Sequence, residues 1–229
     1  MSRALQAIVF DFDGVIANSE PLHLIASQQA LADEDVELSA SDYYSRYLGY
    51  DDVGMFEALG RDRNMPMGQD RVAALVARKG ERMQEMLRTG SVLFPGAIDF
   101  IREAASVVPI AIASGALRHE IEEIIDAAGV GDLFAAIVAA GDTPESKPSP
   151  APYRLAFERL REQTGRDLDP RRSVAIEDSR WGLESARGAG LRLVGVTSSY
   201  GAEELAGAEL VVDGLRALTL PALDRLCAS

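Results

Sequence analysis

A run of four apolar residues, Ala7 to Phe10, ends directly at the acidic motif Asp11-Phe12-Asp13-Gly14. Four β-prone residues in a row are typical of a strand that is buried on both faces of a parallel sheet. Such a strand delivers Asp11 at its C-terminal end, and alternation along the extended chain puts Asp13 on the same side. Gly14 allows a tight turn because it has no Cβ. Two carboxylates at the mouth of a parallel sheet suit a nucleophile or metal ligand beside a proton carrier; the alternative is an acidic loop that only caps a strand.

Segments with the composition of strands recur along the chain, and helical patterns separate the later ones. The helical patterns at Arg118–Ala128 and Trp181–Ala189 are each followed by a glycine, the expected helix stop. A third pattern covers Ala151–Glu162. Strands that alternate with helices predict βαβ units, so the fold class is α/β with a Rossmann-like parallel sheet. The predicted strands are Ala7–Phe10, Pro109–Ala113, Ala135–Ala140, Ser173–Ile176, Leu193–Thr197 and Leu210–Val212.

The interval from about Glu20 to Arg88 is helical in pattern and breaks the alternation. Roughly seventy residues are too many for one crossover helix, so an inserted helical subdomain is expected. We predict an α/β core from residues 1–16 and 91–229, and a helical cap from residues 17–90. An insertion directly after the acidic strand is expected to cover the carboxylates as a lid. The candidate helix faces are Leu22, Ile25, Ala26, Gln29 and Ala30 in one helix, and Val72, Leu75, Val76, Lys79 and Met83 in another.

Two loops after the insertion contain groups that can bind an anion. Ser114 and Gly115 end the strand at Pro109–Ala113, and a hydroxyl with free backbone amides at a helix start can hold an anion. The alternative is that Ser114 only caps the following helix. Lys147 lies just before a helix for which Ser149 is the predicted N-cap. The alternative for Lys147 is an exposed loop lysine.

Glu177 and Asp178 repeat the opening pattern, because they follow the predicted strand Ser173–Ile176. Acids at neighbouring strand ends repel one another unless a cation lies between them. Hard oxygen ligands without His or Cys favour magnesium over zinc. All of these motifs fall at the C-terminal ends of strands, where open α/β sheets bind ligands.

Taken in order, the motifs at Asp11, Ser114, Lys147 and Glu177 resemble those of the haloacid dehalogenase-like (HAD) hydrolase superfamily. Within it they resemble the helical-capped branch of β-phosphoglucomutases and phosphoglycolate-type phosphatases. The resemblance implies that Asp11 is the nucleophile that forms an aspartyl-phosphate and that Asp13 is the general acid and base. The implied phosphate-binding residues are Ser114, Gly115 and Lys147, and the implied Mg²⁺ ligands are Asp11, the backbone carbonyl of Asp13, Glu177 and Asp178.

The implied reaction is hydrolysis of a phosphomonoester by a HAD-family phosphatase. The dehalogenases of the superfamily lack the acid at Asp13, and its phosphonate hydrolases use a cap lysine in a loop that here, at 48–52, contains none. A sugar-phosphate mutase is the alternative, because His23 and Lys79 resemble its cap pattern. The 48–52 loop, however, carries acids where the mutase has an arginine that grips the distal phosphate. A non-catalytic phosphometabolite-binding protein is the second alternative. Candidate substrate contacts in the cap are His23, Arg46 and Lys79; for Lys79 the alternative is a solvated helix face, and for His23 packing at the hinge.

The net charge of −13 disfavours a nucleic-acid or anionic-membrane partner. The longest apolar stretch, Leu133 to Ala140, is too short to span a bilayer. The N-terminus lacks the pattern of a secretory signal, so a cytoplasmic location is expected. The expected partner is a small phosphorylated metabolite, of the sugar-phosphate or phosphoglycolate type. A monomer is expected, and the physiological substrate and the pathway stay open.

Overall fold

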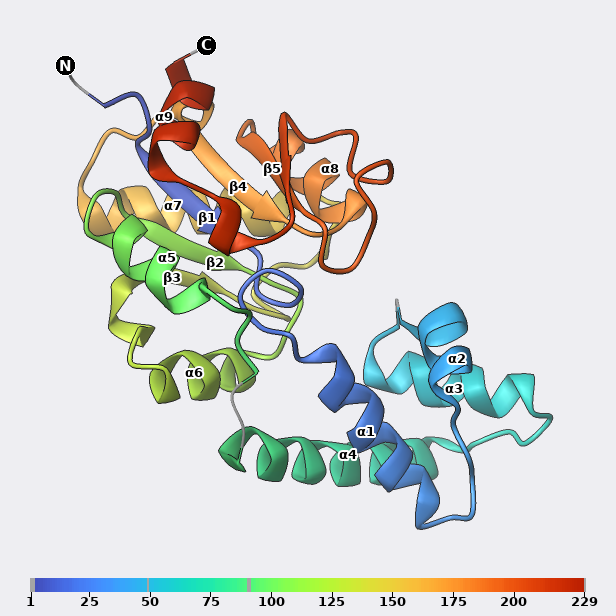
Figure 1. Cartoon of the computed structure of the whole chain (residues 1–229). Helices are drawn as coiled ribbons and strands as arrows, with labels where there is room; N and C mark the ends of the chain where they lie inside the picture. Colours follow the sequence, from blue (N-terminus) through green and yellow to red (C-terminus); the bar gives the residue numbers. More distant parts are fainter. Residues whose placement is uncertain (1–2, 49, 90–91, 229) are drawn as a thin grey trace. The chain divides into compact units, whose positions relative to one another are not determined.

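The computed structural model describes residues 3–48, 50–89 and 92–228. Its chain divides into two compact units, which we call the core unit (Met1–Asn18 with Val92–Ser229) and the helical unit (Ser19–Ser91). Figure 1 draws both units, coloured along the sequence. The sequence-based boundaries were 16/17 and 90/91, and the second of these falls on Gly90 and Ser91, which lie outside the described residues.

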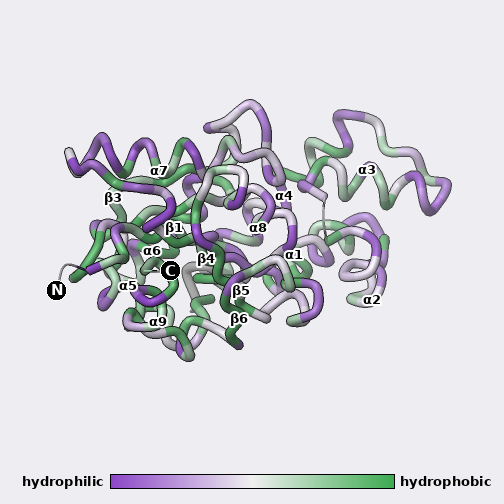
Figure 2. The backbone as a smooth tube through the Cα atoms, turned by 90° about the horizontal axis from the view of Figure 1, so that it is seen from above, coloured by the Kyte–Doolittle hydropathy of each residue, from purple (hydrophilic) through white to green (hydrophobic). Residues whose placement is uncertain are grey.

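A six-stranded sheet forms the centre of the core unit, with the strand order β3-β2-β1-β4-β5-β6 (Figure 1). Every neighbouring pair is parallel, which confirms the predicted α/β class with its Rossmann-like core. The strands are β1 (Ala7–Phe10), β2 (Ile110–Ala113), β3 (Phe134–Val138), β4 (Ser173–Glu177), β5 (Arg192–Val196) and β6 (Leu210–Val212). Figure 2 colours the central strands mainly as hydrophobic, as expected for a sheet that helices cover on both faces.

Helices bury both faces of the sheet. On one face, alternate residues such as Ala7 and Val9 share a cluster with α7 (Ala151–Thr164) and α8 (Arg180–Gly188). On the other, Phe10 packs edge-on against Phe100, with ring centroids 6.1 Å apart. The other elements of the core unit are α5 (Ala97–Ala105), α6 (Arg118–Ala127) and α9 (Leu220–Ala228), with short 3-10 turns at Gly131–Leu133, Pro170–Arg172 and Leu215–Ala217.

The register of the strands brings the predicted motifs to one edge of the sheet. Phe10, the last residue of β1, pairs with Ile112 of β2 and Ile176 of β4. The Asp11 N–H continues this pairing and donates to the Ile176 carbonyl at 2.9 Å. Because parallel strands point the same way, the residues that follow β1, β2 and β4 all leave the sheet at its carboxyl edge.

The helical unit has no strand among its described residues. The α4 face was predicted correctly, since Val72, Leu75, Lys79 and Met83 are buried. The α1 face was right only in part: Ala26 and Ala30 are buried, but Ile25 is 39% exposed and Ser27 is buried as well. Ser27 tolerates burial because its hydroxyl donates to the His23 carbonyl at 2.7 Å. The elements are α1 (Glu20–Ala32), α2 (Ala40–Asp42), the π-helical turn η1 (Tyr43–Tyr47), α3 (Asp52–Asp62) and α4 (Gln69–Thr89).

Among the described residues, no helix is both long and apolar enough to cross a lipid bilayer.

Candidate active site

Three carboxylates meet at the carboxyl edge of the sheet. Asp11 follows β1, Glu177 ends β4 and Asp178 follows it, and one oxygen from each lies within 4.8 Å of the others. All three are buried, and Glu177 is 0% exposed. The Lys147 ammonium bridges two of them, with Nζ 2.8 Å from Asp11 Oδ1 and 2.6 Å from Glu177 Oε1. The structure therefore brings together four of the predicted site residues.

The electrostatics of this cluster follow from burial and crowding. Burial raises the pKa of Asp11 well above its ordinary value, and the charge of Glu177 raises it further, against the opposing effect of Lys147. Burial, followed by the charge of Glu177, also raises the pKa of Asp178 to about 7. Burial alone would lower the pKa of Lys147, but Asp11 and Glu177 outweigh it and raise that pKa. Lys147 is therefore a firmly charged ammonium among acids whose charges it compensates only in part.

Protein donors hold the Glu177 carboxylate at both oxygens. Oε1 accepts from Lys147 and, at 2.9 Å, from the Tyr153 hydroxyl. Oε2 accepts from the Asp178 and Ser179 N–H groups at 3.2 and 3.3 Å, and from the Ser179 hydroxyl at 3.1 Å. The carboxylate also fills the space beside Gly182, where a Cβ would lie 1.9 Å from Glu177 Cδ. A larger residue than glycine at position 182 would thus displace the carboxylate.

The turn after β1 requires the predicted glycine for two reasons. Gly14 has a φ of +77°, and an added Cβ would lie 1.8 Å from Asp178 Oδ2. The loop after β5, which the sequence analysis did not identify, contacts this turn. There the Ser198 hydroxyl donates to the Gly14 carbonyl, and Ser199 hydrogen-bonds to Asp178. Asp13 is partly buried in the same turn.

Ser114 and Gly115 follow β2 on the neighbouring side of β1. The Ser114 N–H donates to the Val138 carbonyl at 2.9 Å, and its buried hydroxyl accepts from the Ala116 N–H at 3.0 Å. The alternative role for Ser114 as the cap of α6 is wrong, because Leu117 holds that position without a side-chain cap. Gly115 is exposed, with open space around a Cβ added there.

The loop before α7 corrects two expectations. Lys147 is only 15% exposed at its side chain, so the alternative of an exposed loop lysine is wrong. The helix starts at Ala151 with Pro150 at the N-cap position, one residue later than the predicted cap at Ser149. The Ser149 hydroxyl still accepts a hydrogen bond from the Ala151 N–H at 3.3 Å.

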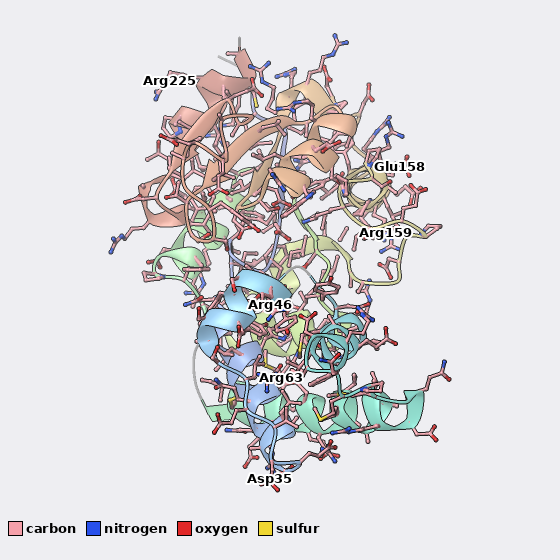
Figure 3. All side chains as sticks on the ribbon, turned by 90° about the vertical axis from the view of Figure 1, so that its right-hand side faces the viewer. Asp35, Arg46, Arg63, Glu158, Arg159 and Arg225 are labelled. Carbon is pink, nitrogen blue, oxygen red and sulfur yellow. The ribbon has the colours of Figure 1, made fainter. Side chains whose placement is uncertain are left out.

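The cap candidates of the helical unit fall into two groups. Lys79 is 3% exposed, lies with Nζ 2.9 Å from His23 Nδ1 and pairs with Asp52, so the solvated-face alternative is wrong. Arg46, labelled in Figure 3, pairs with Asp62 at 2.7 Å and is half exposed. The pairing of Lys79 with Asp52 was not predicted, because the two residues lie 27 positions apart with no local pattern that links them.

Tyr153, Gly182 and Ser199 were not predicted as site residues. Tyr153 is one apolar-face residue of a predicted helix, and Gly182 is one glycine near a predicted helix start. Neither position carries a local pattern that points to a site. The Tyr153 contact with Glu177 depends on the packing of α7 against the sheet, whereas Gly182 meets Glu177 because α8 begins directly after the turn that follows β4.

Comparison with known proteins identifies the family to which this parallel α/β fold and its acidic edge belong. The family model "haloacid dehalogenase-like hydrolase" matches residues 5–190. Protein CbbY of Rhodobacter capsulatus is 32% identical, covering 97% of this chain and 99% of that protein. A phosphoglycolate phosphatase of Pectobacterium atrosepticum is 26% identical, covering 92% and 89%.

Among solved structures, a mutant of CbbY from Rhodobacter sphaeroides in complex with xylulose-(1,5)-bisphosphate matches with a TM-score of 0.83. It is 30% identical, and the match covers 96% of this chain and 99% of that one. The chain belongs to the haloacid dehalogenase-like hydrolases, and its curated relatives support a phosphatase enzyme.

Proposed function

We propose that this protein is a Mg²⁺-dependent phosphomonoester hydrolase that acts on a small phosphorylated metabolite through an aspartyl-phosphate. The observation that carries the proposal is the placement of Lys147 between Asp11 and Glu177, beside Asp178. A fixed ammonium next to a buried carboxylate suits phosphoryl transfer, which depends more on charge compensation and positioning than on elaborate covalent chemistry.

Two displacements at phosphorus make up the proposed reaction. An Asp11 carboxylate oxygen forms a bond to phosphorus while the ester P–O bond breaks, and Asp13 gives its proton to the departing alkoxide oxygen. Asp13, now ionised, then takes a proton from a water molecule whose oxygen attacks the same phosphorus. The bond between phosphorus and Asp11 breaks, which releases inorganic phosphate and restores the Asp11 carboxylate. Asp13 ends the cycle protonated.

Ser114, Gly115 and Lys147 are the proposed phosphate contacts. Ser114 can turn its hydroxyl proton toward a phosphoryl oxygen, because the oxygen serves as acceptor in its bond from Ala116. Gly115 leaves open space above the chain for such a group. The Lys147 ammonium has three N–H donors and uses two on Asp11 and Glu177, so one remains for the phosphate.

The donor set fits a hard divalent cation. Three buried carboxylates share one edge, and oxygen-only ligands are those that Mg²⁺ prefers. We propose that Asp11, the backbone carbonyl of Asp13, Glu177 and Asp178 hold Mg²⁺. When bound, the ion supplies charge compensation between the nucleophile and the phosphoryl oxygens.

The proposed substrate class is a sugar phosphate or a phosphoglycolate-type metabolite. It is supported by relatives that carry the phosphoglycolate phosphatase name and by the CbbY structure in complex with xylulose-(1,5)-bisphosphate. His23, Arg46 and Lys79 remain the proposed substrate contacts of the cap. Hydrolysis is favoured over the mutase reaction because Asp52 already compensates the Lys79 charge. The cap thus has less positive charge to offer a second phosphate.

Phosphate release from sugar phosphates, phosphoglycolate and nucleotides, with Mg²⁺ or EDTA, tests this proposal. Metal-dependent release from one compound by the wild type, abolished in Asp11→Asn with the fold retained, is the expected result. Release that survives in Asp11→Asn would refute the nucleophile assignment. Conversion of β-glucose 1-phosphate to glucose 6-phosphate with a bisphosphate primer, without phosphate release, would make the protein a mutase. Absence of both reactions would favour a binding protein.

A further inference from the structure

Tyr153 contacts both partners of the central ion pair. Its hydroxyl donates to Glu177 Oε1 at 2.9 Å, and the Lys147 Nζ lies 5.1 Å from the centroid of its ring. That separation is within the range of a cation–π contact. The Lys147 ammonium donates to the same Glu177 oxygen. Tyr153 therefore contacts the carboxylate with its polar end and the ammonium with its aromatic face.

We propose that Tyr153 is a positioning residue of the active site, which keeps Glu177 and Lys147 in place so that the ammonium stays against Asp11. The inference rests on the proposed phosphatase function, since it assigns a role within that same site. Tyr153 does not touch the reacting atoms in this assignment; it acts through the two residues that it contacts.

The surroundings of Glu177 show why such a residue matters. The carboxylate is fully buried, and hydrogen bonds and the Lys147 ammonium compensate its charge. Hydrogen bonds to charged groups are stronger than those between neutral groups. Without the hydroxyl, Oε1 keeps Lys147 as its single donor, so the ammonium is drawn toward Glu177 at the expense of Asp11. A role in packing alone would need the ring of Tyr153 but not its hydroxyl.

Tyr153→Phe separates these two roles, because it keeps the ring and removes the hydroxyl. We expect turnover to fall about tenfold with the KM for a small phosphate ester nearly unchanged, the scale of one lost hydrogen bond to a charge. Mg²⁺ affinity, measured by calorimetry without substrate, is expected to fall severalfold. Tyr47→Phe is the matched control, because the Tyr47 hydroxyl also donates to a carboxylate, Asp62, at 2.9 Å. Tyr47→Phe should lose some stability, less than Tyr153→Phe because Asp62 is 35% exposed, and should leave Mg²⁺ affinity unchanged.

The lysine content of the chain allows a direct readout that needs neither substrate nor metal. Lys79 and Lys147 are its two lysines, so labelling lysine with ¹⁵N at Nζ gives one ammonium signal from each. Loss of one signal in Lys147→Gln assigns it. Tyr153→Phe should shift the Lys147 signal and leave the Lys79 signal in place, whereas Tyr47→Phe should leave the Lys147 signal in place.

The outcomes separate this inference from the proposed function. An unchanged Lys147 signal together with unchanged turnover and Mg²⁺ affinity in Tyr153→Phe overturns the positioning role, even if the wild type is a phosphatase. A shifted Lys147 signal supports it even if no substrate is hydrolysed, in which case the proposed function alone has failed. If Tyr153→Phe does not fold, the test is made on the wild type. A nuclear Overhauser contact between the Lys147 side chain and the Tyr153 ring is expected there, and its absence overturns the proposal.

Discussion

Gly182 offers a sharp test of how tightly the acidic cluster is built. It lies in the first turn of α8, and a Cβ at this position would lie 1.9 Å from Cδ and Oε1 of Glu177. The clashing atoms belong to the buried Glu177 carboxylate, which accepts hydrogen bonds at both oxygens. The clash therefore cannot be relieved by rotating a free side-chain end. Gly182→Ala must therefore displace the Glu177 carboxylate or the start of α8.

The magnitude follows from two opposing contributions. Replacing glycine by alanine within a helix stabilises a protein by up to about 1 kcal/mol. Separating a buried carboxylate from its ammonium partner costs about 3–5 kcal/mol. We therefore expect Gly182→Ala to lower the free energy of unfolding by roughly 2–4 kcal/mol. For a chain of this length that corresponds to a fall in Tm of about 10 °C.

Chemical denaturation followed by the fluorescence of Trp181, the single tryptophan, measures the unfolding of the core unit. Gly80→Ala is the matched control, because Gly80 lies inside α4 with nothing within 4 Å of an added Cβ. Measured by circular dichroism, the free energy of unfolding of Gly80→Ala is expected to equal or exceed that of the wild type. A Gly182→Ala variant as stable and as active as the wild type would refute the argument that Glu177 is fixed against α8.

Three further predictions concern other parts of the chain. Burial would raise the pKa of Asp142, but a hydrogen bond from Arg159 and the charge of Arg118 hold that pKa below the ordinary 3.8. The ionised Asp142 carboxylate therefore stabilises the fold above pH 4, and this stabilisation is lost as the pH falls further. Asp142→Asn should lower the free energy of unfolding at pH 7 by about 1–3 kcal/mol. In acid denaturation, the free energy of unfolding of this variant should fall less than that of the wild type between pH 5 and about pH 2. Asp13→Ala should cut turnover about a hundredfold or more in single-substrate kinetics, and an unchanged rate would exclude it as acid and base. Lys79→Ala should alter preference across a substrate panel while small generic esters are little affected; equal losses on every substrate would make Lys79 structural.

Those parts of the fold and site that depend on local pattern were predictable. The apolar run before Asp11 and the one before Glu177 identify buried parallel strands, and parallel strands necessarily end at one edge. Knowing which strands are parallel is enough to place Asp11, Ser114 and Asp178 on the same edge. No long-range information beyond the strand pattern was required.

The remaining features depend on packing between segments distant in sequence. Tyr153 reaches Glu177 across 24 positions, through the packing of α7 beneath the sheet. The buried face of α1 was predicted only in part, because the helix contains two apolar stripes and because Ser27 is buried with its hydroxyl bonded to the His23 carbonyl. The pairing of Lys79 with Asp52 joins the middle of α4 to the start of α3. The periodicity of neither helix predicts that the two pack together. Such contacts are set by tertiary packing, which a single sequence does not encode in any short window.

Charge balance at the sheet edge connects these observations to the proposed metal site. Three buried carboxylates meet one ammonium there, which leaves two formal negative charges in the cluster. Burial, followed by the charge of Glu177, raises the pKa of Asp178, so the second of these causes belongs to the same crowding of acids. One divalent cation compensates the two charges, whereas a second lysine would compensate only one. The same arrangement therefore explains why a cation of charge two suits this edge and why Lys147 must be held firmly against Asp11.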